Sequence, residues 1–330
     1  MQSSQPLLTI AIPTFNRSSF LNELLSCLFD QCVSNPKIEL LVSDNHSADE
    51  TPSVVNAYID RGLDVHYLRN PTNLGADRNF LQCFEKAKGK YVWIIGDDDV
   101  VVPGAIGKII TYLEGNEYNL VYVSSYVFDG SKSFNGASSC RIPTVINDVH
   151  VFVRAIHINF TFISGSIINK NYVMASNQED LSALVGTNLV QLGWTYAALN
   201  GYVRGLYIHE KLVGMRTNNT GGYLLSRVFG LNLKTTTEHR LHDRTIAQSI
   251  INGTLMRFLP AALLYVRRSE RFEKEQAPET VLTPVFGSNP RYWFFVFPIL
   301  KMPHRLASSW LFLIRVLNKV DKALGSVLMR

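Results

Sequence analysis

Three consecutive carboxylates, Asp97, Asp98 and Asp99, follow the short apolar run 91–95 in the sequence GKYVWIIGDDDVVVPGA. Adjacent carboxylates repel one another, and a divalent cation relieves that repulsion. Hard ions such as Mg²⁺ bind a few carboxylates together with phosphate oxygens and water. The triplet therefore predicts a metal site that works with a phosphate-bearing ligand. The alternative is a solvated turn that caps a helix starting near Pro103, because Asp is common at helix starts.

The elements that must position these carboxylates form an alternating pattern of short apolar runs and longer helical segments. Continuous apolar strands joined through helices are typical of a mostly parallel sheet with helices on both faces. The expected strands are 7–12, 38–43, 65–68, 91–95 and 120–123, and the expected helices are 20–32, 51–61, 76–87 and 104–113. The pattern predicts an α/β fold.

Polar clusters follow the first four expected strands: PTFNR, SDNHS, RNPTNLGADRN and GDDD. In parallel sheets ligands bind beyond the carboxyl ends of the strands, where the loops converge. We therefore expect the four clusters to form one polar rim. This repetition favours a ligand site over an isolated solvated turn.

Four segments, IAIPTFNR, LLVSDNHSADET, NPTNLGADRN and AKGKYVWIIGDDDVVVPGAI, occur in this order within the first 125 residues or so. As a set they resemble the nucleotide-sugar-binding half of family-2 glycosyltransferases of the GT-A fold. The resemblance implies a donor-binding half at 1–125, an acceptor-binding half at 126–221 and a helical C-terminal region at 222–330. It also implies a mostly parallel sheet flanked by helices.

The same resemblance implies roles for individual residues. Pro13, Thr14 and Arg17 would border the base and ribose of the donor, and Asp44 would accept a hydrogen bond from the nucleobase. Arg78 would lie near the base or the diphosphate, where a guanidinium pairs well with phosphate oxygens. A surface ion pair on a helix is the alternative for Arg78, and a turn-forming role is the alternative for Asp44.

The acidic turn departs from the D-x-D-D form that the family usually has before PGA. Gly96 stands in the place of the first Asp, Asp97 in the variable place and Asp98 in the place of the second Asp. Asp98 is therefore our first choice as ligand of Mg²⁺ or Mn²⁺. Asp99 or Asp97 would make the second contact, and Asp97 also belongs to the expected donor site.

An inverting transferase needs a carboxylate that takes a proton from the acceptor hydroxyl. In the family this base is usually the Asp of a Glu-Asp pair that opens a helix. Here the pair is Glu179 and Asp180, but the place expected for it, counted from the helix NLVQLGWTYAALNGY, falls nearer Thr187 and Asn188. Asp180 is therefore a candidate base, with a solvated acidic pair as the alternative.

Residues 150–230 resemble, more loosely, abequosyltransferase-like enzymes of bacterial surface-polysaccharide assembly. The segments VGTNLVQLGWTYAAL and IHEKLVGMRTNNTGG carry this similarity. It implies that Arg216, Asn218 and Asn219 belong to a loop over the donor or acceptor. A plain polar surface loop is the alternative.

The segment 291–330 contains seven Lys or Arg and one acidic residue, Asp321, interleaved with aromatic side chains. This composition suits the headgroup region of an anionic bilayer, where a helix can lie flat and bury one face. The alternative is that the segment packs on the chain's own helices or on another subunit, such as a second copy in a homo-oligomer. The resemblance favours the membrane, because acceptors in such assembly are lipid-linked.

The composition is that of an ordinary globular chain. Of 330 residues, 46% are hydrophobic and 18% charged, and 32 basic against 27 acidic residues give no indication of nucleic acid. Cys27, Cys32, Cys83 and Cys140 lack the spacing of a zinc site, so we expect a reduced, cytosolic protein. The N-terminus does not resemble a signal peptide, and no apolar run predicts a membrane-spanning helix.

These observations predict a metal-dependent hexosyl- or deoxyhexosyl-transferase that is peripheral at the inner face of the cell membrane. It would move a sugar from a nucleotide-diphosphate sugar to a lipid-linked oligosaccharide in O-antigen, capsule or exopolysaccharide assembly. A catalytically inactive scaffold subunit that binds the nucleotide sugar is one alternative. A nucleotidyltransferase is another, although PTFNRSSF lacks the Gly-rich phosphate loop typical of that class.

Overall fold

The computed structural model describes residues 5–128, 142–176, 179–217, 222–268 and 277–327, with side chains described as far as residue 319. The chain divides into two compact units. One consists of Met1–Phe152 and Asn159–Asn219, and the other of Val153–Ile158 and Thr220–Arg330. The expected division of the first unit into donor-binding and acceptor-binding halves near residue 126 stays a prediction.

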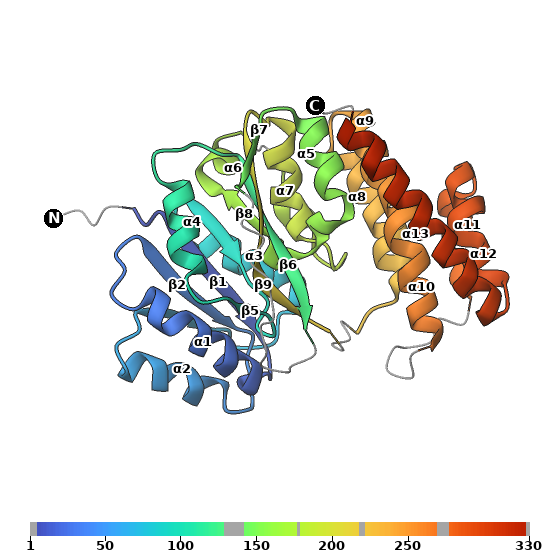
Figure 1. Ribbon diagram of the computed structural model, residues 1–330. Helices are drawn as coiled ribbons and strands as arrows, with labels where there is room; N and C mark the ends of the chain where they lie inside the picture. Colours follow the sequence, from blue (N-terminus) through green and yellow to red (C-terminus); the bar gives the residue numbers. More distant parts are fainter. Residues whose placement is uncertain (1–4, 129–141, 177–178, 218–221, 269–276, 328–330) are drawn as a thin grey trace. The chain divides into compact units, whose positions relative to one another are not determined.

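The first unit is built on a single sheet. Its strands are β1 (Leu8–Thr14), β2 (Ile38–Asp44), β3 (Val65–Arg69), β4 (Tyr91–Ile94), β5 (Val100–Val101), β6 (Leu120–Phe128), β7 (Thr144–Ile146), β8 (Ser166–Asn169) and β9 (Gly205–Arg216). The strand order is β3-β2-β1-β4-β8-β6-β9-β5, and β7 pairs with β9 (Figure 1).

Strand direction differs between the two parts of this sheet. The strands β3, β2, β1 and β4 are all parallel, as the alternating pattern predicts, because a helix links each one to the next along the chain. Beyond β4 the sheet is mixed: β8 is antiparallel to both β4 and β6, while β6 and β9 are parallel. The predicted α/β class is confirmed, and parallel pairing is continuous only in the first part.

Helices cover both faces of the sheet. Those of the first unit are α1 (Ser18–Cys32), α2 (Thr51–Asp60), α3 (Ala76–Lys86), α4 (Ala105–Leu113), α6 (Lys170–Ser176) and α7 (Gln191–Asn200), and α5 (Val149–Ile156) spans the boundary between the units. Apolar side chains of α1, α2 and α4 form one core with the sheet, around the fully buried Trp93. Against the other face, Phe84 of α3 stacks on Trp194 of α7 with ring centroids 4.7 Å apart.

Glycines set the start of two helices that follow strand-end loops. Gly75 precedes α3 with a φ of 85°, and Gly104 precedes α4 with a φ of 77°. Side chains disfavour this left-handed backbone, whereas glycine adopts it freely. The turn lets the chain reverse after each loop, so the polar clusters stay at the carboxyl edge of the sheet.

The second unit is helical. It contains α8 (Leu233–Arg240), α9 (Arg244–Gly253), α10 (Leu259–Arg268), α11 (Pro278–Phe286), α12 (Phe297–Lys301) and α13 (His304–Val327), with π-helical turns at Ser226–Asn232, Thr254–Phe258 and Tyr292–Val296. Its core includes Leu255, Leu259, Phe286 and Tyr292.

Within the described residues, one continuous helical stretch, Arg244–Arg267, has the length and apolar composition that a membrane crossing needs. Half of its most apolar window is buried inside the structure, and a core helix passes the same test. Cys27, Cys32 and Cys83 are free thiols, whereas Cys140 lies outside the described residues. The buried surroundings of Cys32 raise the pKa of its thiol to about 12.

Two glycine-to-alanine substitutions should change stability in opposite directions. At Gly89 a Cβ atom would lie 2.5 Å from the backbone nitrogen of Thr9, so Gly89→Ala should destabilise the protein by about 1–3 kcal/mol. At Gly107, inside α4, a Cβ atom meets nothing within 4 Å, so Gly107→Ala should stabilise it by about 0.5–1 kcal/mol. Denaturant unfolding of both variants measures these changes. An equal change in the free energy of unfolding for the two variants would contradict the close approach of Gly89 to Thr9.

Candidate functional site

The acidic turn lies directly beyond β4, beside the end of β1. The backbone N–H of Asp99 donates to the carbonyl of Gly96 at 3.0 Å, which closes the turn. A Cβ atom on Gly96 would lie 3.1 Å from Oδ1 of Asp98 and 3.4 Å from Oδ2 of Asp99. The carboxylates therefore crowd the place where the resembled family usually has an Asp side chain, and glycine leaves room for them.

Asp97 is buried, with 4% of its surface exposed, and it faces β1. Its Oδ2 accepts a hydrogen bond from Oγ1 of Thr14 at 2.8 Å, and its Oδ1 accepts one from Nη1 of Arg17 at 3.1 Å. Burial raises the pKa of Asp97 to about 6, although the charge of Arg17 opposes the rise. The structure thus brings together three of the residues predicted for the donor site.

Asp99 is also buried, but it faces the later strands. Its Oδ2 accepts from Oγ of Ser164 at 2.6 Å, and its Oδ1 accepts from the backbone N–H of Arg216 at 3.1 Å. The Ser164 hydroxyl in turn accepts from the backbone N–H of Gly96 at 2.9 Å. Burial, and next the charge of Asp98, raise the pKa of Asp99 to about 7. Both oxygens of this carboxylate therefore hold the turn in place.

Asp98 is the most exposed of the three carboxylates, with 15% of its side chain exposed against 5% for Asp97. Its Oδ1 lies 4.0 Å from Nη1 of Arg17. The described residues contain no group of three or more His, Cys, Asp or Glu side chains placed to hold a metal ion. Because Asp97 and Asp99 are engaged by protein donors, the turn fits an ion bound through Asp98 and completed by diphosphate oxygens and water. It does not fit an ion held by protein groups alone.

Arg216, at the end of β9, anchors the acidic turn. Its Nε donates to the carbonyl oxygen of Asp98 at 2.9 Å, and its guanidinium pairs with Glu23 of α1. The guanidinium also lies 4.9 Å from the ring centroid of Phe20 and 4.5 Å from that of Phe128. Arg216 is thus a positioning residue for the turn, and its predicted place in a covering loop stays a prediction. Asn218 and Asn219 lie outside the described residues.

Asp44, at the end of β2, is fully buried and its oxygens are engaged by the protein. Oδ1 accepts from the backbone N–H of Ser47 at 2.8 Å, and Oδ2 accepts from the Tyr67 hydroxyl at 2.7 Å. Nε of Arg69 lies 3.5 Å from Oδ2. Asp44 therefore shapes the loop after β2, which corresponds to the turn-forming alternative. Its contact with a nucleobase stays a prediction.

Asp44 also lies beside the donor-site residues of β1. Thr14 is the register partner of Asp44, and the buried Pro13 is the partner of Ser43. The ends of β1 and β2 thus bring the predicted base-binding residues together, as the alternating pattern indicated.

Arg78 lies in the first turn of α3 and is exposed, whereas its neighbour Asp77 is buried. Oδ2 of Asp77 accepts from the backbone N–H groups of Gly186 at 2.7 Å and Asn188 at 2.9 Å. Asp77 is therefore bound to backbone and not paired with Arg78, and burial raises its pKa. This carboxylate ties α3 to the loop before α7, a link between distant segments that the sequence did not indicate.

The candidate base Asp180 caps a short 3₁₀ helix, Leu181–Leu184. Its Oδ1 accepts from the backbone N–H of Ser182 and its Oδ2 from the Ser182 hydroxyl, both at 2.8 Å. Asp180 and Glu179 are exposed. The loop before α7 holds Thr187 and Asn188 where the resembled family places its acidic pair. The role of Asp180 in proton transfer stays a prediction.

Sequence reasoning missed several residues that build the site. Ser164 binds Asp99 of the acidic turn, Glu23 pairs with Arg216, and Asp77 binds the loop before α7. Each of the three is distant in sequence from the group it binds. Asparagines form a second network, in which Asn70 donates to Asn45 at 3.1 Å and Nδ2 of Asn79 donates to the carbonyl of Ser43 at 2.9 Å. The asparagines in RNPTNLGADRN were the available signal for this network.

The fold and the acidic turn define a glycosyltransferase of the GT-A class. The chain belongs to glycosyl transferase family 2, whose family model matches residues 9–175. S. aureus TarS 1–349, in a crystal structure with UDP, superposes with a TM-score of 0.63 over 92% of this chain and 87% of that chain. The two sequences are 13% identical, so this similarity concerns the fold alone, and it confirms the predicted GT-A fold.

Two relatives are more similar in sequence over part of the chain. Abequosyltransferase RfbV of Salmonella typhimurium is 38% identical over 109 residues, which are 33% of each chain. GalNAc(5)-diNAcBac-PP-undecaprenol beta-1,3-glucosyltransferase of Campylobacter jejuni is 30% identical over 106 residues, which are 32% of this chain and 34% of the relative. The matches thus span about a third of the length of these relatives.

The stability of the metal-free protein should fall as pH rises from about 4 to 7. The pKa values of Asp97 and Asp99, raised to about 6 and about 7 from 3.8, mean that the native state binds more protons than the unfolded chain in this range. Stability then decreases as those protons are lost. Melting temperatures across this range should fall less steeply for Asp99→Asn than for the wild type.

The exposed Asp64 offers a control for net charge, because Asp64→Asn removes one surface carboxylate away from the turn. That variant should keep the wild-type pH dependence. An equally steep decline in Asp99→Asn would show that the carboxylate of Asp99 is not the group that titrates.

Proposed function

We propose that this glycosyltransferase is metal-dependent and moves a sugar from a nucleotide-diphosphate sugar to a lipid-linked oligosaccharide in bacterial surface-polysaccharide assembly. The observation that carries the proposal is the acidic turn itself. Two of its carboxylates are buried and bound by protein donors, which leaves Asp98 as the more exposed one, within 4.0 Å of Arg17. A carboxylate beside a guanidinium suits a metal ion that bridges to a diphosphate.

Transfer of the sugar leaves negative charge on the departing diphosphate, and groups that stabilise this charge accelerate the reaction. Asp98 would hold a divalent ion, which would supply positive charge there. Arg17 is held at the turn by Asp97, and the exposed Arg78 at the start of α3 is available to phosphate oxygens. Asp180 is the proposed base for the acceptor hydroxyl.

Binding of a panel of nucleoside diphosphates, with and without Mg²⁺ or Mn²⁺, tests the donor site. We expect one diphosphate to bind in a metal-dependent way, and Asp98→Ala to remove the metal dependence with at least a 10-fold loss of affinity. Asp180→Asn is the matched control. It should bind the diphosphate normally but lower the transfer rate by about 10²–10⁴-fold, as expected for loss of a general base.

Two outcomes would count against the proposal. If no diphosphate binds under any metal condition, the donor site is assigned wrongly. If the diphosphate binds with the metal but neither the wild type nor Asp180→Asn transfers sugar to any acceptor, the chain is the inactive scaffold subunit. The capping role of Asp180 and the absence of a carboxylate at Thr187 and Asn188 are the features that favour this second candidate.

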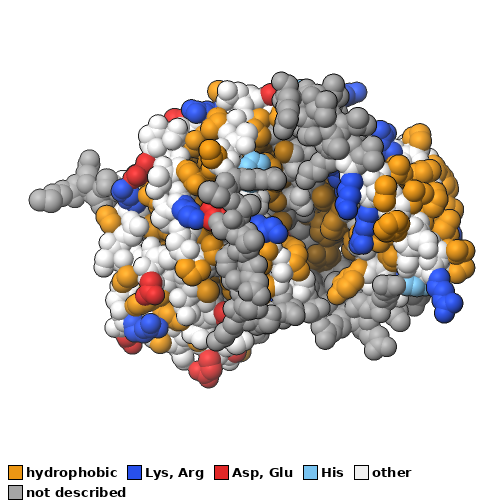
Figure 2. Space-filling view, viewed as in Figure 1, with side chains coloured by type: hydrophobic (Ala, Val, Ile, Leu, Met, Phe, Trp, Pro, Cys, Tyr) orange, Lys and Arg blue, Asp and Glu red, His pale blue; other side chains and the backbone are white. Residues whose placement is uncertain are grey.

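The acceptor class rests on two observations. The Campylobacter jejuni relative is named as a glucosyltransferase that acts on an undecaprenol-linked glycan. In this chain, Figure 2 shows hydrophobic side chains gathered over the C-terminal helices, with Lys and Arg side chains beside them. A surface of this kind suits a lipid-linked acceptor held at an anionic membrane.

The helix α13 presents an exposed apolar face. Leu306, Leu313 and Leu317 are spaced for one face of the helix and are 60%, 41% and 39% exposed, and Phe312 beside them is 69% exposed. The adjacent side of the helix, which includes the buried Ile314, packs inward. Arg305, Arg315 and Lys319 lie on the same helix and would meet anionic headgroups. We therefore propose that α13 lies on the cytoplasmic face of the membrane, which makes the enzyme peripheral.

Phe312→Glu should weaken binding to anionic vesicles by about 10-fold, because it places a carboxylate in the face that enters the headgroup region. Vesicle flotation with phosphatidylglycerol and with phosphatidylcholine measures this. Val203→Glu is the control, since Val203 is a comparably exposed apolar residue, 70% exposed, in the other unit. Unchanged flotation of Phe312→Glu would contradict the membrane assignment. A concentration-dependent dimer that the substitution dissociates would assign this face to a second copy of the chain.

A further inference from the structure

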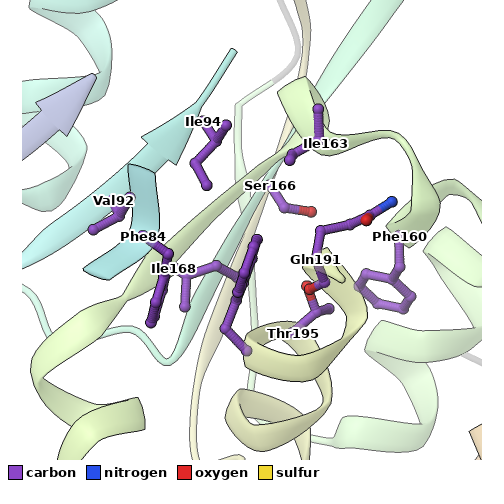
Figure 3. A pocket seen from close by; sticks show the side chains of 10 residues that line it. Phe84, Val92, Ile94, Phe160, Ile163, Ser166, Ile168, Gln191 and Thr195 are labelled. Atoms are coloured by element: carbon purple, nitrogen blue, oxygen red, sulfur yellow. The ribbon is translucent and has the colours of Figure 1, made fainter. Parts of the chain in front are cut away.

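A small cavity lies on the face of the sheet that α3 and α7 cover (Figure 3). Its walls are mainly apolar and come from β4, β8, α3, α7 and the turns before β8, with Ile94, Ile163, Phe160 and Trp194 among them. The cavity volume is about 10 Å³, which is room for one group the size of a water molecule or a methyl. Apolar walls around so small a space favour a methyl.

One hydroxyl in this cavity is left for a ligand. Ser166 is 7% exposed, and its Oγ makes no hydrogen bond to the residues that the structure describes. Two other polar groups of the wall donate to backbone carbonyls: Nε2 of Gln191 donates to Thr161 at 2.8 Å, and Oγ1 of Thr195 donates to Gln191 at 2.8 Å. Buried polar groups normally have partners, so an unpaired Ser166 indicates that something supplies one.

The cavity adjoins the acidic turn. In the antiparallel register Trp93 pairs with Ile167, so the next residues, Ile94 and Ser166, lie side by side on the same face. Ile94 is two residues from Gly96, a separation that spans at most about 7 Å. Ser164, two residues before Ser166, holds both Asp99 and Gly96. A sugar at the reaction centre is therefore within reach of the cavity.

We propose that this cavity receives a methyl group carried by one of the two sugars, next to a polar atom that hydrogen-bonds Ser166. A 6-deoxy carbon beside a ring or hydroxyl oxygen has this chemistry, and so does an acetamido methyl beside its amide. A hydroxymethyl group or a bare hydroxyl in the same place is disfavoured, because the walls are mainly apolar and the hydroxyl would lose its hydration. The inference rests on the proposed sugar transfer and makes the cavity its specificity determinant.

The probes are sugar pairs that differ only in this group. UDP-N-acetylglucosamine against UDP-glucose tests the donor, in the presence of Mg²⁺. Methyl N-acetylglucosaminide against methyl glucoside, and methyl D-fucoside against methyl D-galactoside, test the acceptor, with UDP and Mg²⁺ bound. We expect the methyl-bearing member of one pair to bind about 10-fold more tightly to the wild type. The arm that shows the preference identifies which sugar the cavity serves.

Ser166→Thr adds a methyl that fills the cavity and keeps a hydroxyl, so it should abolish the preference. Ser53→Thr, the same change at an exposed position of α2, should keep it. If Ser166→Thr melts at a lower temperature, Ser166→Ala provides the second test. It keeps the space and removes the hydrogen bond, and should weaken the methyl-bearing ligand about 3- to 5-fold while leaving its hydroxyl counterpart unchanged.

A lack of preference in every pair, or a preference that neither Ser166 variant alters, overturns the inference. Metal-dependent binding of a nucleoside diphosphate, measured on the same samples, reports on the donor site separately. If the diphosphate binds and the methyl preference is absent, only the cavity assignment fails. If the diphosphate does not bind, the proposed function fails first.

Discussion

Electrostatic repulsion among Asp97, Asp98 and Asp99 is the constraint on which the site depends. The protein meets it by dividing the carboxylates between different partners. Asp97 is held by Thr14 and Arg17 from β1 and the loop that follows, and Asp99 by Ser164 and the backbone of Arg216 from the later strands. Asp98 is left as the more exposed group, which suits the proposed metal ion.

This division of partners explains why the two parts of the sheet must meet at β4. The parallel part supplies the donors to Asp97, and the antiparallel β8 brings the turn that contains Ser164 back to the same edge. Arg216 links the acidic turn to α1, because its guanidinium donates to the carbonyl of Asp98 and pairs with Glu23. Rigid strands thus fix a turn that carries three negative charges.

Another buried carboxylate, Asp77, fixes the loop before α7. Asp77 sits in a cluster of backbone N–H groups before α7 and ties that loop to the helix that carries Arg78. A carboxylate used in this way is not free for proton transfer, and the loop itself offers Thr187 and Asn188. The candidate base Asp180 lies at a 3₁₀ cap instead. The segment predicted to bind the acceptor therefore differs from the pattern of the resembled family more than the segment predicted to bind the donor.

The sequence by itself determined the alternation of strands and helices up to β6, the rim of polar loops and the family, since apolar periodicity and adjacent motifs are local properties. Predicted and observed boundaries differ there by a few residues at most, except that β6 extends to Phe128 and that the short β5 (Val100–Val101) was not predicted. Only the tertiary structure decided the antiparallel course of β8, the contacts of Ser164, Glu23 and Asp77, and the cavity at Ser166. These depend on contacts between residues about 65 to 190 positions apart, which local pattern does not encode.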